Sequence, residues 1–198
     1  MSVVFNDVER LILERWTEVM GLIEAHETLQ KRLEEQLEIV ADRVGRWARP
    51  YGFEVDSTPR FGDINAWRPA WAERRKDPKV FLTVGGLCPM GFRKVDAQHP
   101  YLWVFTTNLE QYKLKEPQRI AFAHSLRTAL GDRAREWEAH DVDDVGAPLG
   151  KYLADYDDTF RAKLSLDPNA MFDFCTKHFP TLFSLADMIE TEIQRLGK

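Results

Sequence analysis

The sequence predicts an α+β protein with a long N-terminal helix, a three- to four-stranded antiparallel sheet and a helical C-terminal third. Three observations lead to this fold class. Apolar residues recur at helical spacing between Asn6 and Pro50. Residues 51–108 change to short alternating runs that turn residues separate. Helical spacing returns from Pro117 to the end of the chain.

The first helix is predicted to begin at Asn6, because Glu9 follows it at the spacing of a capping box. Its apolar residues are separated by three or four positions, at Ile12, Trp16, Val19 and Ile23 and again at Leu33, Leu37, Val40, Val44 and Trp47. A helix of about 40 residues is about 60 Å long, which one compact core cannot cover. We therefore expect it to bend, break or find a partner, with Gly21 and Gly45 as the weak points.

This length suggests a division of the chain. Residues 1–49 are predicted to form the long helix and a candidate assembly arm, and residues 50–198 the α+β domain. Since the apolar seam resembles that of a coiled coil, we expect self-association through the N-terminal helix.

The sheet is predicted from four runs, at residues 52–56, 61–67, 79–84 and 101–107. No helix long enough for a parallel crossover fits between them, so the strands should be antiparallel. Residues 151–156 are ambiguous. The third part of the chain is predicted to contain helices beginning near Pro117, Asp167 and Thr181.

Composition limits the possible classes of protein. The 198 residues are 44% hydrophobic, enough for one large domain. Acids within the first ten residues argue against a signal peptide, and no segment is apolar enough to span a bilayer, so no membrane partner is expected. Cys88 and Cys175 lack the CxxC spacing of a thiolate zinc site and suit a reducing cytoplasm. No cofactor is predicted.

Charge is segregated along the chain despite a net value of −5. Lys and Arg number 4 against 10 Asp and Glu in residues 1–42, but 11 against 5 in residues 43–94. Basic groups interleaved with aromatic rings suit phosphate contacts and base stacking. Alternatively, they could balance the acidic first helix. The candidate residues for binding nucleic acid or an acidic protein are Arg60, Arg68, Trp71, Arg74, Arg75 and Lys76.

Two features could support catalysis instead. Cys88 lies in a glycine-rich loop after a predicted strand, and His99 could serve as its base in a thiol hydrolase. Acids gathered in residues 140–144 and 155–158 could hold a metal in a hydrolase or nuclease. A packed cysteine and solvated acids are the more ordinary interpretations of these features. The favoured function is therefore a non-enzymatic binding or assembly protein, with the enzyme as the alternative.

The order of features resembles the non-catalytic accessory region that follows PD-(D/E)XK-type nuclease domains in some bacterial and phage proteins. The resemblance lies in residues 51–71, in the aromatic strands at 81–87 and 101–107, and in the tail at 148–196 with its Met171-Phe172-Asp173-Phe174 run. The paired acid and the Glu-x-Lys strand of the nuclease are not found at the family's spacing. The resemblance implies an accessory or targeting module without nuclease activity.

Overall fold

A computed structural model describes residues 6–58, 62–73, 77–88, 99–137 and 145–196. The N-terminal helical region consists of two helices, α1 (Asp7–Glu14) and α2 (Trp16–Ala48). The predicted capping box is confirmed: the Asn6 side chain accepts from the Glu9 amide at 2.9 Å, and the Glu9 carboxylate accepts from the Asn6 amide at 2.7 Å.

The break in this region is at Arg15, whose backbone is not helical (φ −114°, ψ 32°). The expectation of weak points at Gly21 and Gly45 was wrong, because α2 runs through both glycines. One glycine inside a helix costs only about 1 kcal/mol relative to alanine, less than the hydrogen bonds that a break would sacrifice.

The antiparallel sheet is confirmed, and among the described residues it has five strands where three or four were predicted. They lie in chain order as β1 (Glu54–Thr58), β2 (Asp63–Trp67), β3 (Phe81–Gly85), β4 (Tyr101–Phe105) and β5 (Leu149–Tyr152). The additional strand, β5, overlaps the ambiguous segment only at Lys151 and Tyr152, and it pairs with β4. The sequence Leu149-Gly150-Lys151-Tyr152 does not alternate strictly between apolar and polar residues, so only the pairing with β4 identifies this strand.

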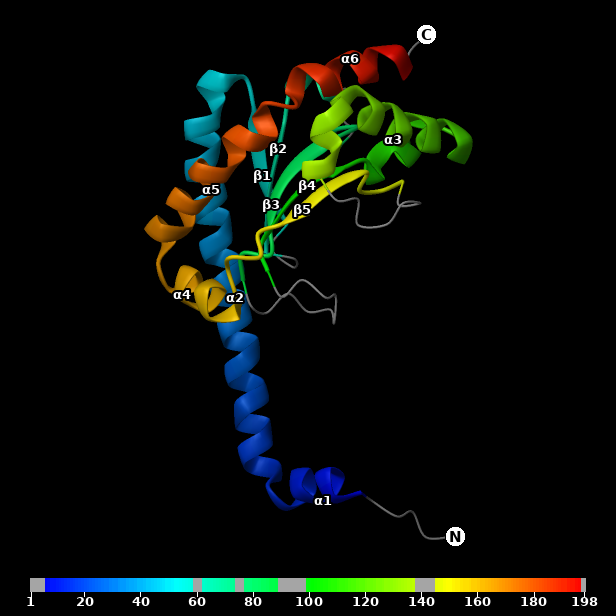
Figure 1. The fold of residues 1–198 in the computed structure, drawn as a ribbon. Coiled ribbons are helices and arrows are strands. Elements are labelled where there is room, and N and C mark those ends of the chain that lie inside the picture. Colours follow the sequence, from blue (N-terminus) through cyan, green and yellow to red (C-terminus); the bar gives the residue numbers. More distant parts are fainter. Residues whose placement is uncertain (1–5, 59–61, 74–76, 89–98, 138–144, 197–198) are drawn as a thin grey trace, which may run out of the picture.

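The other helices in the described ranges are α3 (Glu116–Leu130), α4 (Asp158–Leu166), α5 (Pro168–Phe183) and α6 (Ala186–Leu196). Short 3-10 turns lie at η1 (Arg49–Tyr51), η3 (Pro69–Trp71), η4 (Thr107–Tyr112) and η5 (Gly131–Glu136). Helices α2 and α5 lie along one face of the sheet (Figure 1), and α3 packs against α6. The helical C-terminal third is thus confirmed.

The main core lies between that face of the sheet and the helices. It contains Leu37, Val40 and Val44 from α2, together with the side chains of β2, β3 and β4 that point the same way. The opposite face carries a smaller cluster built on Tyr101, Trp103 and Ala147. The C-terminal half of α2 is therefore an integral part of the α+β body.

Candidate interaction surface

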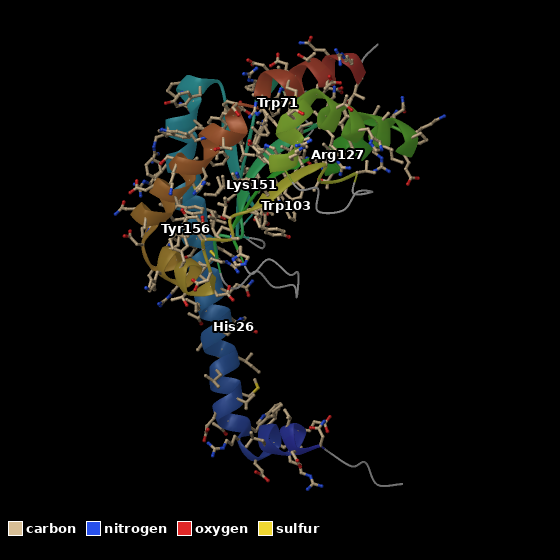
Figure 2. The ribbon with its side chains drawn as sticks, viewed as in Figure 1. His26, Trp71, Trp103, Arg127, Lys151 and Tyr156 are labelled. Carbon is tan, nitrogen blue, oxygen red and sulfur yellow. The ribbon has the colours of Figure 1, made fainter. Side chains whose placement is uncertain are left out.

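The first half of α2, together with α1, projects from the body (Figure 1). His26 lies on this projecting part, below the body (Figure 2). We call residues 7–32 the arm. Large apolar side chains are exposed along it: Trp16 is 54% exposed, Leu22 71% and Ile23 44%. Exposed apolar side chains gathered on one element, as opposed to scattered singly, indicate a surface for another macromolecule.

The apolar seam of the arm continues the seam that the body buries. Farther along α2, Leu33 is partly buried against the core and Leu37 is completely buried. Hydrogen bonds fix this second half of α2 to the body, from Gln36 to the carbonyl of Ser165 at 2.9 Å and from Arg43 to the Asn169 side chain at 3.0 Å and the Pro168 carbonyl at 3.4 Å. The apolar side chains of one continuous seam therefore have two environments. The body covers them after about residue 33, and they are largely exposed before it.

The predicted basic site is only partly within the described residues, since Arg60, Arg74, Arg75 and Lys76 lie outside them. Arg68 forms ion pairs with Asp187 at 2.7 Å and Glu190 at 2.5 Å, which tie the end of β2 to α6. The ring of Trp71 is completely buried and packs edge-on against Phe53. It therefore offers no ring face to a nucleotide base, and we leave Trp71 out of the proposed interface.

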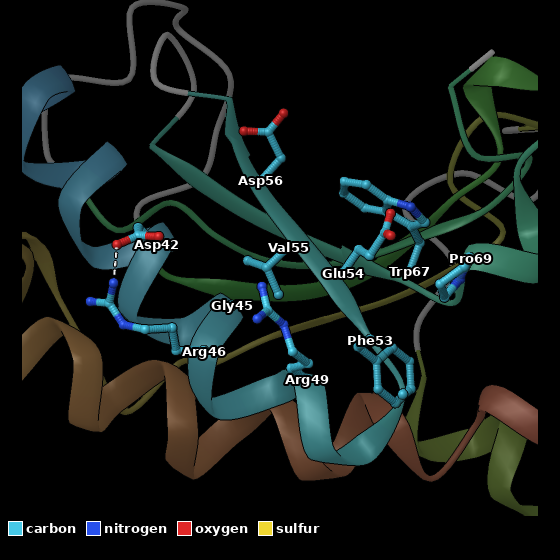
Figure 3. A pocket seen from close by; sticks show the side chains of 11 residues that line it. Asp42, Gly45, Arg46, Arg49, Phe53, Glu54, Val55, Asp56, Trp67 and Pro69 are labelled. Carbon is cyan, nitrogen blue, oxygen red and sulfur yellow. Dashed lines mark hydrogen bonds and ion pairs between the residues drawn. The ribbon is translucent and has the colours of Figure 1, made fainter. Parts of the chain in front are cut away.

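A pocket of about 500 Å³ lies between the C-terminal end of α2 and β1 (Figure 3). Arg46 and Arg49 line it, but so do Asp42, Glu54 and Asp56, and Arg46 pairs with Asp42 at 2.5 Å. Because the lining contains both carboxylates and guanidinium groups, it selects neither anions nor cations.

A second pocket, of about 420 Å³, lies on the opposite side of β1. It shares Glu54, Asp56 and Trp67 with the first and adds Asp77. This lining is acidic, so the pocket is no site for phosphate groups.

A buried polar cluster surrounds the glycine turn at the end of β3. The Asp63 carboxylate, only 5% exposed, accepts from the Tyr101 hydroxyl at 2.7 Å and from the Gly86 amide at 3.2 Å. Burial raises the pKa of Asp63 to about 7, although both hydrogen bonds oppose that shift. Burial likewise raises the pKa of Tyr101, which keeps its proton and remains a donor.

Arg161 of α4 binds the other side of the same turn. It is 5% exposed and donates to the carbonyls of Gly86 at 2.7 Å and Cys88 at 2.5 Å, and it pairs with Asp158 at 2.8 Å. A buried cation with three acceptors is well satisfied. The arrangement holds the Gly85–Cys88 turn between the sheet and α4, so its role is structural.

The proposed thiol pair is not assembled as a nucleophile and its base. Cys88 is buried, and burial raises the pKa of its thiol, which disfavours the reactive thiolate. The groups that act on this pKa are Ser165, Arg161 and Asp63. The Nδ1 atom of His99 instead lies 2.8 Å from the carbonyl of Tyr156.

The structure describes only one of the two acidic segments that were considered as a metal site. Residues 140–144 lie outside the described part of the chain. Asp157 caps α4 by accepting from the Phe160 amide at 2.8 Å, and Asp158 pairs with Arg161. Within the residues that the structure describes, no group of three or more His, Cys, Asp or Glu side chains could hold a metal ion.

Sequence reasoning noticed the glycines of this turn but missed Asp63, Tyr101 and Arg161. The usable signal was Asp63, a carboxylate inside the predicted strand at 61–67.

No family model matches this chain, nor does any curated protein or solved structure. In the described ranges, no helix combines the length and the apolar character needed to cross a membrane.

Proposed function

We propose that the chain is a non-enzymatic assembly protein that associates with a second copy of itself through the arm. The observation that supports this is the exposed apolar seam on a helix that projects from a well-packed body (Figure 1). At about 25 cal/mol per Å², covering side chains of this size is worth several kcal/mol. The dimer would then hold two α+β bodies on one pair of arms, as expected of a cytoplasmic scaffold.

A second helix is the partner that fits this surface. The seam has the three- and four-residue spacing into which the side chains of another helix interlock. A second copy of this chain supplies a matching seam, so no further protein is required. Closed pairs of identical chains are also the commonest form of protein assembly.

Association is expected to depend on the apolar side of the arm. The double variant Leu22→Arg, Ile23→Arg should remain monomeric at concentrations where the wild-type protein is dimeric, because two charges per chain would enter the contact. Multi-angle light scattering over about 1 to 100 μM measures this directly.

Thr28→Arg is the matched control, since Thr28 is exposed on the outward side of the same helix. It should leave the dimer intact. A monomeric wild-type protein at every concentration would overturn the proposed function.

We propose as a second candidate that the basic middle segment contacts nucleic acid or an acidic protein surface. The excess of Lys and Arg in residues 43–94 supports it, and Arg49 is one basic residue of this segment whose side chain is exposed. The resemblance to a nuclease-associated accessory module points the same way and stays a prediction.

The triple variant Arg74→Glu, Arg75→Glu, Lys76→Glu tests this candidate. It should abolish binding to single- or double-stranded DNA or RNA without unfolding the protein, because phosphate contacts dominate such affinities. Fluorescence anisotropy at low salt is the measurement. No binding by the wild-type protein at about 100 μM, where non-specific binders register, would remove the nucleic-acid candidate.

A further inference from the structure

We propose that two arms pair in antiparallel orientation, about a two-fold axis between Glu24 and Ala25 of each copy. This inference rests on the proposed self-association and adds its geometry. The contact then runs from Trp16, which follows the helix break at Arg15, to Leu33, the first residue beyond the arm, whose side chain is only partly buried against the core.

The spacing of the seam fixes the layers of such a contact. Trp16, Ile23 and Gln30 are seven residues apart, and so are Val19, His26 and Leu33. These two series are the a and d positions of a heptad repeat. An antiparallel pair places each a residue opposite a d residue, so Trp16 faces Leu33 of the second copy, Val19 faces its Gln30, and Ile23 faces its His26.

The polar side chain of Gln30 fits this arrangement. Its amide nitrogen donates to the Glu34 carboxylate of the same helix at 3.0 Å. The aliphatic stem can therefore cover Val19 of the second copy while the amide keeps its partner at the edge of the contact.

The residues beside the seam decide the orientation. Leu22 and Leu29, which are 71% and 48% exposed, both occupy g positions, whereas Glu27 and Glu34 occupy e positions. A parallel pair would place each leucine against a glutamate of the partner helix, because g positions then face e positions. The antiparallel pair places Leu22 against Leu29 of the second copy, so that both leucines are covered.

Charge along the arm favours the same orientation. The outer part of the contact carries Glu18, and the part nearer the body carries Lys31 and Arg32. Antiparallel pairing sets Glu18 level with Lys31 of the second copy, whereas parallel pairing sets like charges beside each other. Opposed helix dipoles add to the preference.

Cysteine cross-linking tests the geometry. Val19→Cys and Gln30→Cys chains, mixed under reducing conditions and then oxidised, should give a disulfide between the two variants at least about tenfold more often than either variant alone. Two copies of Val19 would lie about 16 Å apart along the antiparallel pair, beyond the reach of a disulfide. The unsubstituted protein, whose Cys88 and Cys175 are buried, measures the background, and Thr28→Cys should not cross-link.

The outcomes separate this inference from the one on which it rests. A dimer by light scattering in which each variant cross-links with itself would show parallel pairing and overturn the geometry alone. A dimer without cross-links in any mixture would likewise contradict the register. A monomer at every concentration would overturn both proposals.

Discussion

Replacing Asp63 by Asn is expected to remove a pH-dependent loss of about 4 kcal/mol in the free energy of unfolding between about pH 4 and pH 7. The pKa of the Asp63 carboxyl is raised from 3.8 to about 7 in the folded protein, chiefly by burial. Well below pH 4 the group is protonated in both the folded and the unfolded state. As pH rises, the unfolded chain releases the proton first, so the folded state loses stability until it too ionises near pH 7.

Asn is suitable because it keeps the oxygen that accepts from Tyr101 and Gly86 while carrying no charge. Urea unfolding of the wild type and the variant over about pH 4 to 8 gives the difference in free energy at each pH. We expect the free energy of unfolding of the variant to increase relative to that of the wild type as pH rises. Asp56→Asn, in the exposed carboxyl of β1, is the control and should give a nearly constant difference. Parallel curves for Asp63→Asn and wild type would contradict the expectation.

Gly85→Ala is expected to destabilise the protein by about 3 kcal/mol or more. A Cβ atom at this position would lie 2.2 Å from Cε2 of Tyr101 and 2.4 Å from Oδ1 of Asp63. Neither side chain can move away easily, because Tyr101 and Asp63 are hydrogen-bonded to each other and both are buried. The added methyl must therefore separate β3 from β4 or break the hydrogen bond.

Gly21→Ala is the matched control for the same substitution. Its Cβ atom would have no neighbour within 4 Å, and it lies inside α2, so we expect a gain of about 1 kcal/mol from helix propensity. Thermal unfolding of both variants measures the contrast. Equal melting temperatures would show that the turn yields to the added methyl group.

The sequence determined the local elements of this protein well. Asn6 and Glu9 are neighbours in the chain, so their capping box could be recognised from spacing. The antiparallel sheet followed from connections too short for parallel crossovers, which is again a property of adjacent segments. The seam of α2 was visible because helical period depends only on residues three and four apart.

Only the tertiary structure decided which of these features are buried. Ile23 and Val40 have the same helical spacing in the sequence, but only Val40 is buried. Its burial depends on the positions of α5 and the sheet, which pack against the second half of α2. Arg68 pairs with Glu190, which lies 122 positions away, and Asp63 meets Tyr101 across 38 positions. Burial and ion pairing join residues that are remote in the chain. The spacing of residues along the sequence does not predict such contacts, because they form only when the chain folds.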